Sequence, residues 1–257
     1  MTARGERGLA LVSVLWGVAI LSLIAAAMLA ASVSSSQIGR NVWSATQAGA
    51  VADAAVGRAV LSLMDDRMGK QPRVDGKLAV IAVDGVPVRL WIQDESGKIN
   101  LNYADKSLLQ SLFVSAGVAE GEAGALADRI VARRIGPNGA ALFAYRAVDD
   151  VLGVPGMTPA LFRRVAPALT VFGRNGAPNQ SVAPREVLRV LPGMTDDAIA
   201  DILKARDAAP AATGAAAPQS VYLVTAETRT AGARIVRTAV VTFTGDTTKP
   251  YLILAWR

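Results

Sequence analysis

Two residue types that carry much of protein chemistry are missing from this sequence. The chain has 257 residues and contains no cysteine and no histidine. Disulfide frameworks and thiolate metal sites are therefore excluded, and so are imidazole ligands and imidazole general bases. A lack of cysteine fits an oxidising compartment as well as a reducing one, so it leaves the location of the protein open.

The carboxylates offer no catalytic arrangement in place of the missing groups. Adjacent acids occur at Asp65-Asp66, Asp94-Glu95, Asp149-Asp150 and Asp196-Asp197. None has a recognisable nucleophile or base as a partner, and no segment has EF-hand spacing. Such pairs are commonly helix caps or solvated turns. We therefore predict that the chain is not an enzyme, and we assign no catalytic residue and no metal ligand.

The N-terminus contains a long uncharged apolar run. Residues 1–8 are polar and include Arg4 and Arg7, whereas the 23 residues from Leu9 to Ala31 carry no charge, and the next charged residue is Arg40. About 20 apolar residues in a helix cross the hydrocarbon core of a bilayer. The positive-inside rule keeps the two arginines cytoplasmic. The sequence predicts a single-pass inner-membrane protein whose bulk lies in the periplasm.

Three interpretations of this segment differ in processing. A plain signal anchor explains the span alone. A cleaved signal peptide is compatible with the small residues Ala25, Ala26 and Ala27, but the apolar run exceeds the usual core of about 7–15 residues. In the third interpretation, the junction Gly8-Leu9 resembles the leader of type IV pilin-like proteins. That resemblance implies cleavage by a prepilin peptidase after Gly8, N-methylation of Leu9, and retention of the apolar helix.

The segments that follow predict a helix and then a sheet. Val42, Thr46, Gly49, Val56, Val60 and Leu63 recur at helical spacing, which predicts one helix from Leu9 to about Met68. Asp84-Gly85 lies between the apolar segments Leu78–Val83 and Val86–Gln93 and predicts a two-residue β-hairpin. Near the C-terminus, the strand-like segments are Ser220–Arg229, Ala233–Thr244 and Tyr251–Arg257. The predicted fold is α+β: a long N-terminal transmembrane helix packed on an antiparallel, pilin-like sheet, with a large all-α insert between strands.

The boundaries follow from these patterns. The leader is 1–8, the transmembrane helix 9–31, and the amphipathic helix with its hairpin 32–99. The helical insert is 100–206, an Ala/Pro-rich linker is 207–219, and the closing strands are 220–257. Six segments of the insert have helical patterns, with Gly or Pro between them: Asp105–Ala116, Glu122–Ile135, Val148–Leu152, Pro159–Ala168, Pro184–Leu191 and Asp196–Ala208.

The insert contains an internal repeat. Pro155-Gly156-Met157-Thr158 and Pro192-Gly193-Met194-Thr195 each follow a short apolar segment and precede a predicted helix, for which the threonine is a suitable N-cap. Helix-hairpin-helix modules use a similar Gly-apolar-Gly loop to bind DNA phosphates, and Lys98–Ala104 resembles the opening of such modules in membrane-anchored competence proteins. Both loops lack the second glycine, so the backbone approaches a phosphate less freely.

The charge of the chain does not support the DNA-binding alternative. The net charge is +6 and the pI is about 10.0, but the basic residues are spread over the whole chain. Arginines on helices are more often solvated than bound to phosphate. We therefore expect structural hairpins and no nucleic acid. A membrane-anchored, competence-type DNA-binding protein remains the alternative.

Taken together, the order of motifs resembles general secretion pathway protein K, a minor pseudopilin of type II secretion systems. The resemblance rests on the leader ending at Gly8, the segment Asp94–Asn102, the Pro-Gly-Met-Thr turns and the ending Pro250–Trp256, and covers essentially the full chain. It implies a subunit that caps the pseudopilus tip and helps to initiate its assembly. The implied partners are other minor pseudopilins, the major pseudopilin, the prepilin peptidase and the inner membrane.

The resemblance also bears on the N-terminal helix and on cofactors. Counted from Leu9, the fifth residue is Ser13, where major pilins have glutamate; family K members are similar in lacking it. An unpaired carboxylate in lipid costs about 2.5–3.5 kcal/mol on insertion scales, so a subunit with Ser13 needs no neighbour already above it. No cofactor is predicted. Calcium is possible by family resemblance, with ligands that the sequence does not assign.

Overall fold

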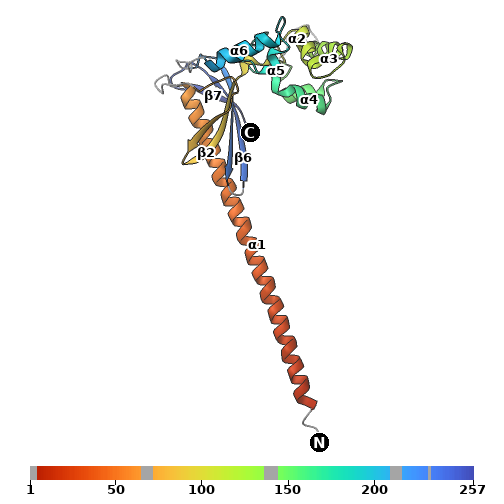
Figure 1. Cartoon of the computed structure of the whole chain (residues 1–257), viewed down its shortest axis with the longest axis vertical. Helices are drawn as coiled ribbons and strands as arrows, with labels where there is room; N and C mark the ends of the chain where they lie inside the picture. Colours follow the sequence, from red (N-terminus) through yellow and green to blue (C-terminus); the bar gives the residue numbers. More distant parts are fainter. Residues whose placement is uncertain (1–4, 65–71, 136–143, 209–215, 231–232) are drawn as a thin grey trace.

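The fold is built on one long helix that continues from the apolar segment into the head of the protein. A computed structural model describes residues 5–64, 72–135, 144–208, 216–230 and 233–257. Helix α1 (Gly5–Met64) has 60 residues, which at 1.5 Å per residue is about 90 Å. Its N-terminal half extends away from the head, and its C-terminal half packs against a sheet (Figure 1). The predicted end of this helix, Met68, lies outside the described residues.

The sheet has five antiparallel strands in the order β1-β2-β5-β6-β7. The strands are β1 (Ala79–Val83), β2 (Val86–Asp94), β5 (Val221–Thr230), β6 (Ala233–Phe243) and β7 (Tyr251–Trp256). Asp84 and Gly85, with φ of 49° and 76°, form the turn between β1 and β2, as a two-residue hairpin requires. The predicted α+β fold, with its antiparallel sheet and its insert between strands, is confirmed.

One face of the sheet packs on α1 through alternate residues. Val88, Leu90 and Ile92 of β2 are buried there, as are Val224 of β5 and Val241 of β6. The matching face of α1 is rich in alanine, including Ala48, Ala52, Ala55 and Ala59. These short side chains let the helix axis lie close to the sheet, while Val56, Val60 and Leu63 fill the space between strands.

The predicted apolar stripe on α1 is wrong at its N-terminal end. Val42 is 60% exposed and Thr46 is also exposed, because the sheet does not reach that far along the helix. Burial against the sheet begins at Ala48. The part of α1 between the apolar span and the head therefore carries exposed apolar side chains, including Ile38 and Trp43.

The insert between β2 and β5 has its own hydrophobic core. Its helices are α2 (Lys106–Ser115), α3 (Glu120–Ala132), α4 (Pro159–Val165), α5 (Arg185–Leu188) and α6 (Asp196–Ala208), with 3₁₀ turns at Glu95–Gly97, Val148–Gly153 and Ala166–Ala168. Three predicted helices need correction: Val148–Leu152 is 3₁₀, Pro184–Leu191 is helical only over α5, and Glu122–Ile135 starts at Glu120 and ends at Ala132. At its C-terminal end, α6 continues through Ala208 into the predicted linker, of which 209–215 lie outside the described residues.

The sequence patterns missed the connection between the insert and the sheet. β3 (Ile99–Asn100) pairs in parallel with β4 (Leu169–Thr170). Gln93 Nε2 donates to the carbonyl of Val182 at 2.9 Å, and Asn179 N donates to the carbonyl of Ser96 at 2.8 Å. A Cβ on Gly97 would lie 2.7 Å from the Val182 carbonyl oxygen, so this close backbone approach requires glycine. The insert is thereby fastened at the end of the sheet remote from the N-terminus (Figure 1).

Candidate functional site

The apolar part of α1 is the first candidate functional region. Val12–Leu29 has a mean hydropathy of 2.4, and none of its residues is buried in the protein. It is long and apolar enough to cross a membrane. Gly8 and Leu9, the predicted cleavage junction, lie within α1, and Ser13 lies on α1 with an exposed side chain. The helix passes without a break from the predicted leader into the span.

The two Pro-Gly-Met-Thr segments of the insert have matching geometry. Met157 N donates to the carbonyl of Val154 at 3.0 Å, and Met194 N donates to that of Leu191 at 3.3 Å. Gly156 and Gly193 have φ of 96° and 75°. Proline followed by a residue of positive φ is the pattern of a type II turn. The repeat therefore encodes the same turn twice.

Each turn is followed by a threonine that caps the next helix. Thr158 Oγ1 accepts a hydrogen bond from Leu161 N at 3.1 Å at the start of α4, and Thr195 Oγ1 accepts one from Ala198 N at 3.2 Å at the start of α6. A phosphate-binding hairpin presents free backbone amides to its ligand. Here the amides of Met157, Leu161 and Ala198 already have partners within the protein, which is what a structural turn requires.

Several arginines of the insert also bind its own backbone. Arg129 Nη1 donates to the carbonyl of Pro155 at 3.0 Å, and Arg133 Nη1 donates to that of Asp150 at 3.2 Å. Arg134 Nε and Nη1 donate to the carbonyls of Leu101 and Ala104 at 2.8 and 2.7 Å. Its burial lowers the pKa of Arg134 from its usual value. These guanidinium groups stabilise loops of the insert.

The adjacent acids act in local structure. Asp94 caps the turn at Glu95–Gly97 by accepting from Ser96 N at 2.8 Å, and Glu95 pairs with Lys98 at 2.6 Å with both side chains buried. The Asp150 carboxylate accepts from Ala147 N and Arg146 N, and these bonds lower its pKa. Asp196 and Asp197 lie in the first turn of α6, where negative charge suits the helix dipole. Asp65 and Asp66 lie outside the described residues.

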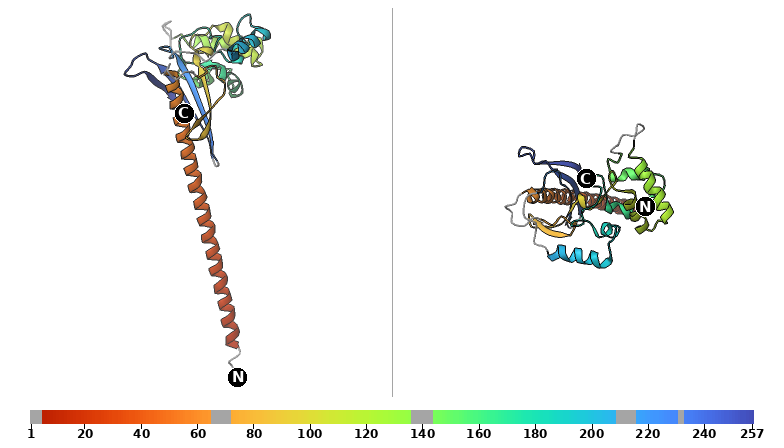
Figure 2. Two further views of the ribbon diagram at one scale, coloured as in Figure 1. Left: turned by 60° about the vertical axis from the view of Figure 1, so that its left-hand side comes forward. Right: turned by 90° about the horizontal axis from the view of Figure 1, so that it is seen from above.

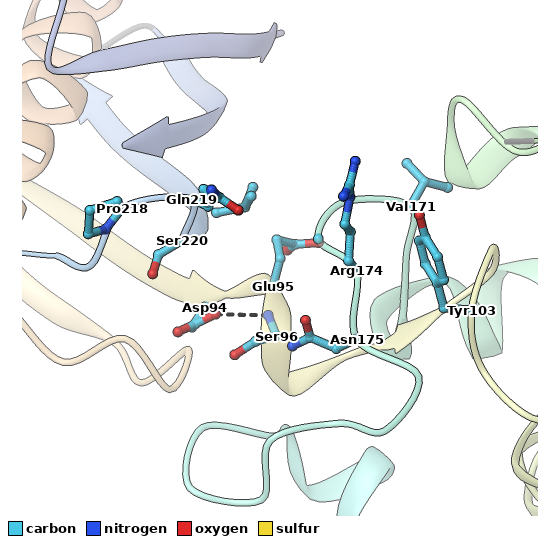
Figure 3. A pocket seen from close by; sticks show the side chains of 12 residues that line it. Asp94, Glu95, Ser96, Tyr103, Val171, Arg174, Asn175, Pro218, Gln219 and Ser220 are labelled. Carbon is cyan, nitrogen blue, oxygen red and sulfur yellow. Dashed lines mark hydrogen bonds between the residues drawn. The ribbon is translucent and has the colours of Figure 1, made fainter. Parts of the chain in front are cut away.

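A cleft of about 480 Å³ lies where the insert meets the sheet. Figure 3 shows Pro218, Gln219 and Ser220 on one side of it and Tyr103 and Val171 on the other. Asp94 and Glu95 line it, but their carboxylates hold Ser96 N and Lys98 as described. Among the residues that the structure describes, no three acids are grouped closely enough to hold a metal ion. Polar and apolar side chains both line the cleft.

The comparison with solved structures supports the fold. No protein-family model matches the chain, and no curated protein matches it. Among solved structures, it is similar to a chain in the crystal structure of the GspK-GspI-GspJ complex from the type 2 secretion system of enterotoxigenic Escherichia coli. The TM-score is 0.50 at 9% identity, over 88% of this chain and 98% of that chain. At this identity the similarity establishes the fold alone, which is that of a pseudopilin-like protein.

Proposed function

We propose that this chain is a minor pseudopilin of a type II secretion system, with a structural role and no catalytic one. The observation that carries the proposal is the continuity of α1, whose exposed apolar half leads directly into the half that packs on the sheet. A signal peptide that is removed needs no continuity with the folded domain. A helix that both anchors the subunit in the membrane and assembles it into a filament requires that continuity.

The leader would be removed after Gly8 on the cytoplasmic side, leaving N-methylated Leu9 as the first residue. Leu9–Ala31 would then hold the subunit in the inner membrane, with the head in the periplasm. Ser13 adds no carboxylate to the lipid-embedded helix, so the subunit would not need a neighbour's N-terminal ammonium before it enters a filament. This supports a role in initiating assembly.

The position of the insert supports a place at the pseudopilus tip. The insert lies beyond the sheet, at the end of the molecule opposite the N-terminus (Figure 1). A second head stacked along the direction of α1 would collide with it. Other minor pseudopilins and the major pseudopilin would contact the subunit from below, along the exposed apolar stretch of α1 that includes Ile38, Val42 and Trp43.

The intact mass of protein extracted from membranes tests the processing step. A mature chain that begins at N-methylated Leu9 is the expected result. A chain that begins at Met28 would identify a cleaved signal peptide, and an uncut chain a plain signal anchor. Either result would overturn the pseudopilin proposal.

Affinity isolation of the tagged chain from crosslinked membranes tests assembly. Other minor pseudopilins should be recovered with it, and Trp43→Arg should reduce their recovery. Trp43 is 73% exposed and is not part of the core between α1 and the sheet, so its replacement should leave the head folded. Val80→Arg, a matched change at an exposed residue of β1, should leave recovery unchanged. Recovery of no other minor pseudopilin would refute the assembly role.

Two further measurements address the alternative function and the cofactor. Duplex binding that weakens steeply with salt would favour the competence-type DNA-binding alternative. A rise in melting temperature on adding calcium would support the calcium binding that the family resemblance implies, for which we assign no ligands.

A further inference from the structure

Strand β7 forms an edge of the sheet and is apolar on both faces. In the strand order of the described residues, β7 has β6 on one side and no strand on the other. Figure 2 shows the β6–β7 hairpin at the outer side of the head. Tyr251, Leu252, Ile253, Leu254 and Trp256 are each between 38% and 50% exposed. The register places Tyr251, Ile253 and Trp256 on the face that carries α1, and Leu252 on the opposite face. Within the described part of the chain, the main packing partner of β7 is β6, and neither set is extensively covered by a helix.

The backbone of β7 presents hydrogen-bonding groups to this open side. Arg257 and Thr238 exchange both backbone hydrogen bonds, at 2.9 and 2.8 Å, and Thr244 N donates to the carbonyl of Pro250 at 3.0 Å. Alternate residues of an antiparallel strand point their backbone groups to opposite sides. With the shift in register beside Val240 and Val241, the N–H and C=O groups of Tyr251, Ile253 and Trp256 are directed outward.

The opposite edge of the sheet is shielded in a way that β7 is not. Arg58 Nη1 donates to the outward carbonyl of Ala82 in β1 at 3.0 Å, so a side chain of α1 already occupies that edge. Natural edge strands are often blunted by such contacts, by a bulge, by proline or by a charge within the strand. β7 has a register shift opposite Val240 and Val241, but neither charge nor proline between Tyr251 and Trp256. An apolar edge without these side chains suits the addition of a further strand.

The charges at the ends of β7 indicate which strand it would accept. Lys249 and Arg257 flank it and are exposed, the latter 3.9 Å from Asp149 but 73% exposed. Asp246, the acid in the β6–β7 connection, already accepts a hydrogen bond from Thr248 N. Antiparallel pairing of two copies centred on Ile253 would put Lys249 opposite Arg257 at both ends, and parallel pairing would also bring like charges together. Self-association through β7 is therefore disfavoured.

We propose that β7 is a docking edge for an extended apolar segment of a different protein, with a carboxylate at each end of that segment. The segment adds to the sheet as a sixth strand, bonds to the outward groups of Tyr251, Ile253 and Trp256, and places its acids beside Lys249 and Arg257. The edge belongs to the head, so this inference does not depend on processing at Gly8 or on filament membership.

A labelled synthetic peptide, Asp-Thr-Val-Thr-Val-Thr-Val-Asp, tests the proposal by fluorescence anisotropy against the full chain in detergent. Ile253→Pro removes an outward N–H at a position where an edge strand tolerates proline, and it should weaken binding by about tenfold or more, from lost hydrogen bonds and steric blocking. Val80→Pro makes the matched change at an outward position of β1 and should change binding by less than about twofold.

Two peptide variants complete the test without altering the protein. The same peptide with lysine at both ends should bind at least about tenfold more weakly at low salt, and this difference should vanish near 1 M NaCl, where the Debye length is about 3 Å. N-methylation of alternate peptide amides should abolish binding in one phase of alternation and spare it in the other.

Several outcomes would overturn the proposal. These are equal binding by the Ile253→Pro variant, equal loss in both proline variants, equal binding of the lysine-ended peptide at low salt, and no effect of N-methylation in either phase. Concentration-dependent self-association in sedimentation, removed by Ile253→Pro, would assign the edge to a second copy instead. If Ile253→Pro fails to fold, as judged by circular dichroism, the methylated peptides decide the result.

Discussion

Replacement of Lys98 by methionine should destabilise the head strongly, because it leaves a buried carboxylate without its cation. Lys98 Nζ lies 2.6 Å from Glu95 Oε1, and the two side chains are only 9% and 4% exposed. Removal of one partner of a buried ion pair costs about 3–5 kcal/mol. At about 1.4 kcal/mol for each factor of ten, that is a loss of 100-fold or more in the folding equilibrium.

The double variant Glu95→Leu with Lys98→Met separates this explanation from a loss of packing. It removes both charges and keeps apolar volume at the site, so its stability should be close to that of the unmodified chain. Lys106→Met is the matched surface control. Its partner Asp128 lies 2.7 Å away, but both side chains are about half exposed, so the loss should be at most about 1 kcal/mol.

Urea denaturation of the full chain in detergent measures these differences. Near-ultraviolet circular dichroism and tryptophan fluorescence can follow it, since Trp91 lies on β2, the strand that leads into the turn containing Glu95. A Lys98→Met variant within about 1 kcal/mol of the unmodified chain would refute the reasoning. So would a double variant as unstable as the single one.

Three other predictions follow from local geometry. Gly97→Ala should lower the free energy of unfolding in urea by about 1–3 kcal/mol, because its Cβ would meet backbone atoms at 2.7–2.9 Å. Gly57→Ala, on an open helix surface, should raise it by up to about 1 kcal/mol. A Gly97→Ala variant more stable than Gly57→Ala would contradict the close approach. Hydrogen bonding to Arg234, with Arg229 adding to it, lowers the pKa of Glu227 from 4.5 to about 2. The stability that Glu227 contributes is therefore present above pH 4.5 and is lost as pH falls through about 2. In an acid titration, the free energy of unfolding of Glu227→Gln should fall less over that interval than that of the unmodified chain. Parallel curves for the two proteins would contradict the ion pairs. Thr158→Ala should cost about 1 kcal/mol by removing the cap of α4, measured by the same denaturation, whereas Thr158→Ser should cost less; equal losses would argue against the cap.

The sheet could be predicted from sequence because its signals are local. Alternating β-branched residues and the turn Asp84-Gly85 define the first hairpin within a residue or two of its observed bounds. The turns of the insert were predictable for the same reason, since Pro155-Gly156 carries its conformation in two adjacent residues.

Features that depend on distant partners could not be predicted in this way. β3 and β4 have two residues each and meet only in the folded chain, so no periodic pattern marks them. Val42 has the spacing of a core residue, but the sheet ends before it reaches that position; apolar spacing alone does not say which surface a helix faces. Arg134 reads as a solvated cation in sequence, and its role becomes visible only once the carbonyls of Leu101 and Ala104 converge on it.

The short, hydrogen-bonded junction between sheet and insert has a mechanical consequence. Gln93 and Ser96 bond directly to the segment around Val182 and Asn179, while α1 lies against the same sheet. A force along the axis of α1 would therefore be transmitted to the insert through packed side chains and hydrogen bonds, and not only through the covalent chain. A molecule in contact with the insert would receive that force directly.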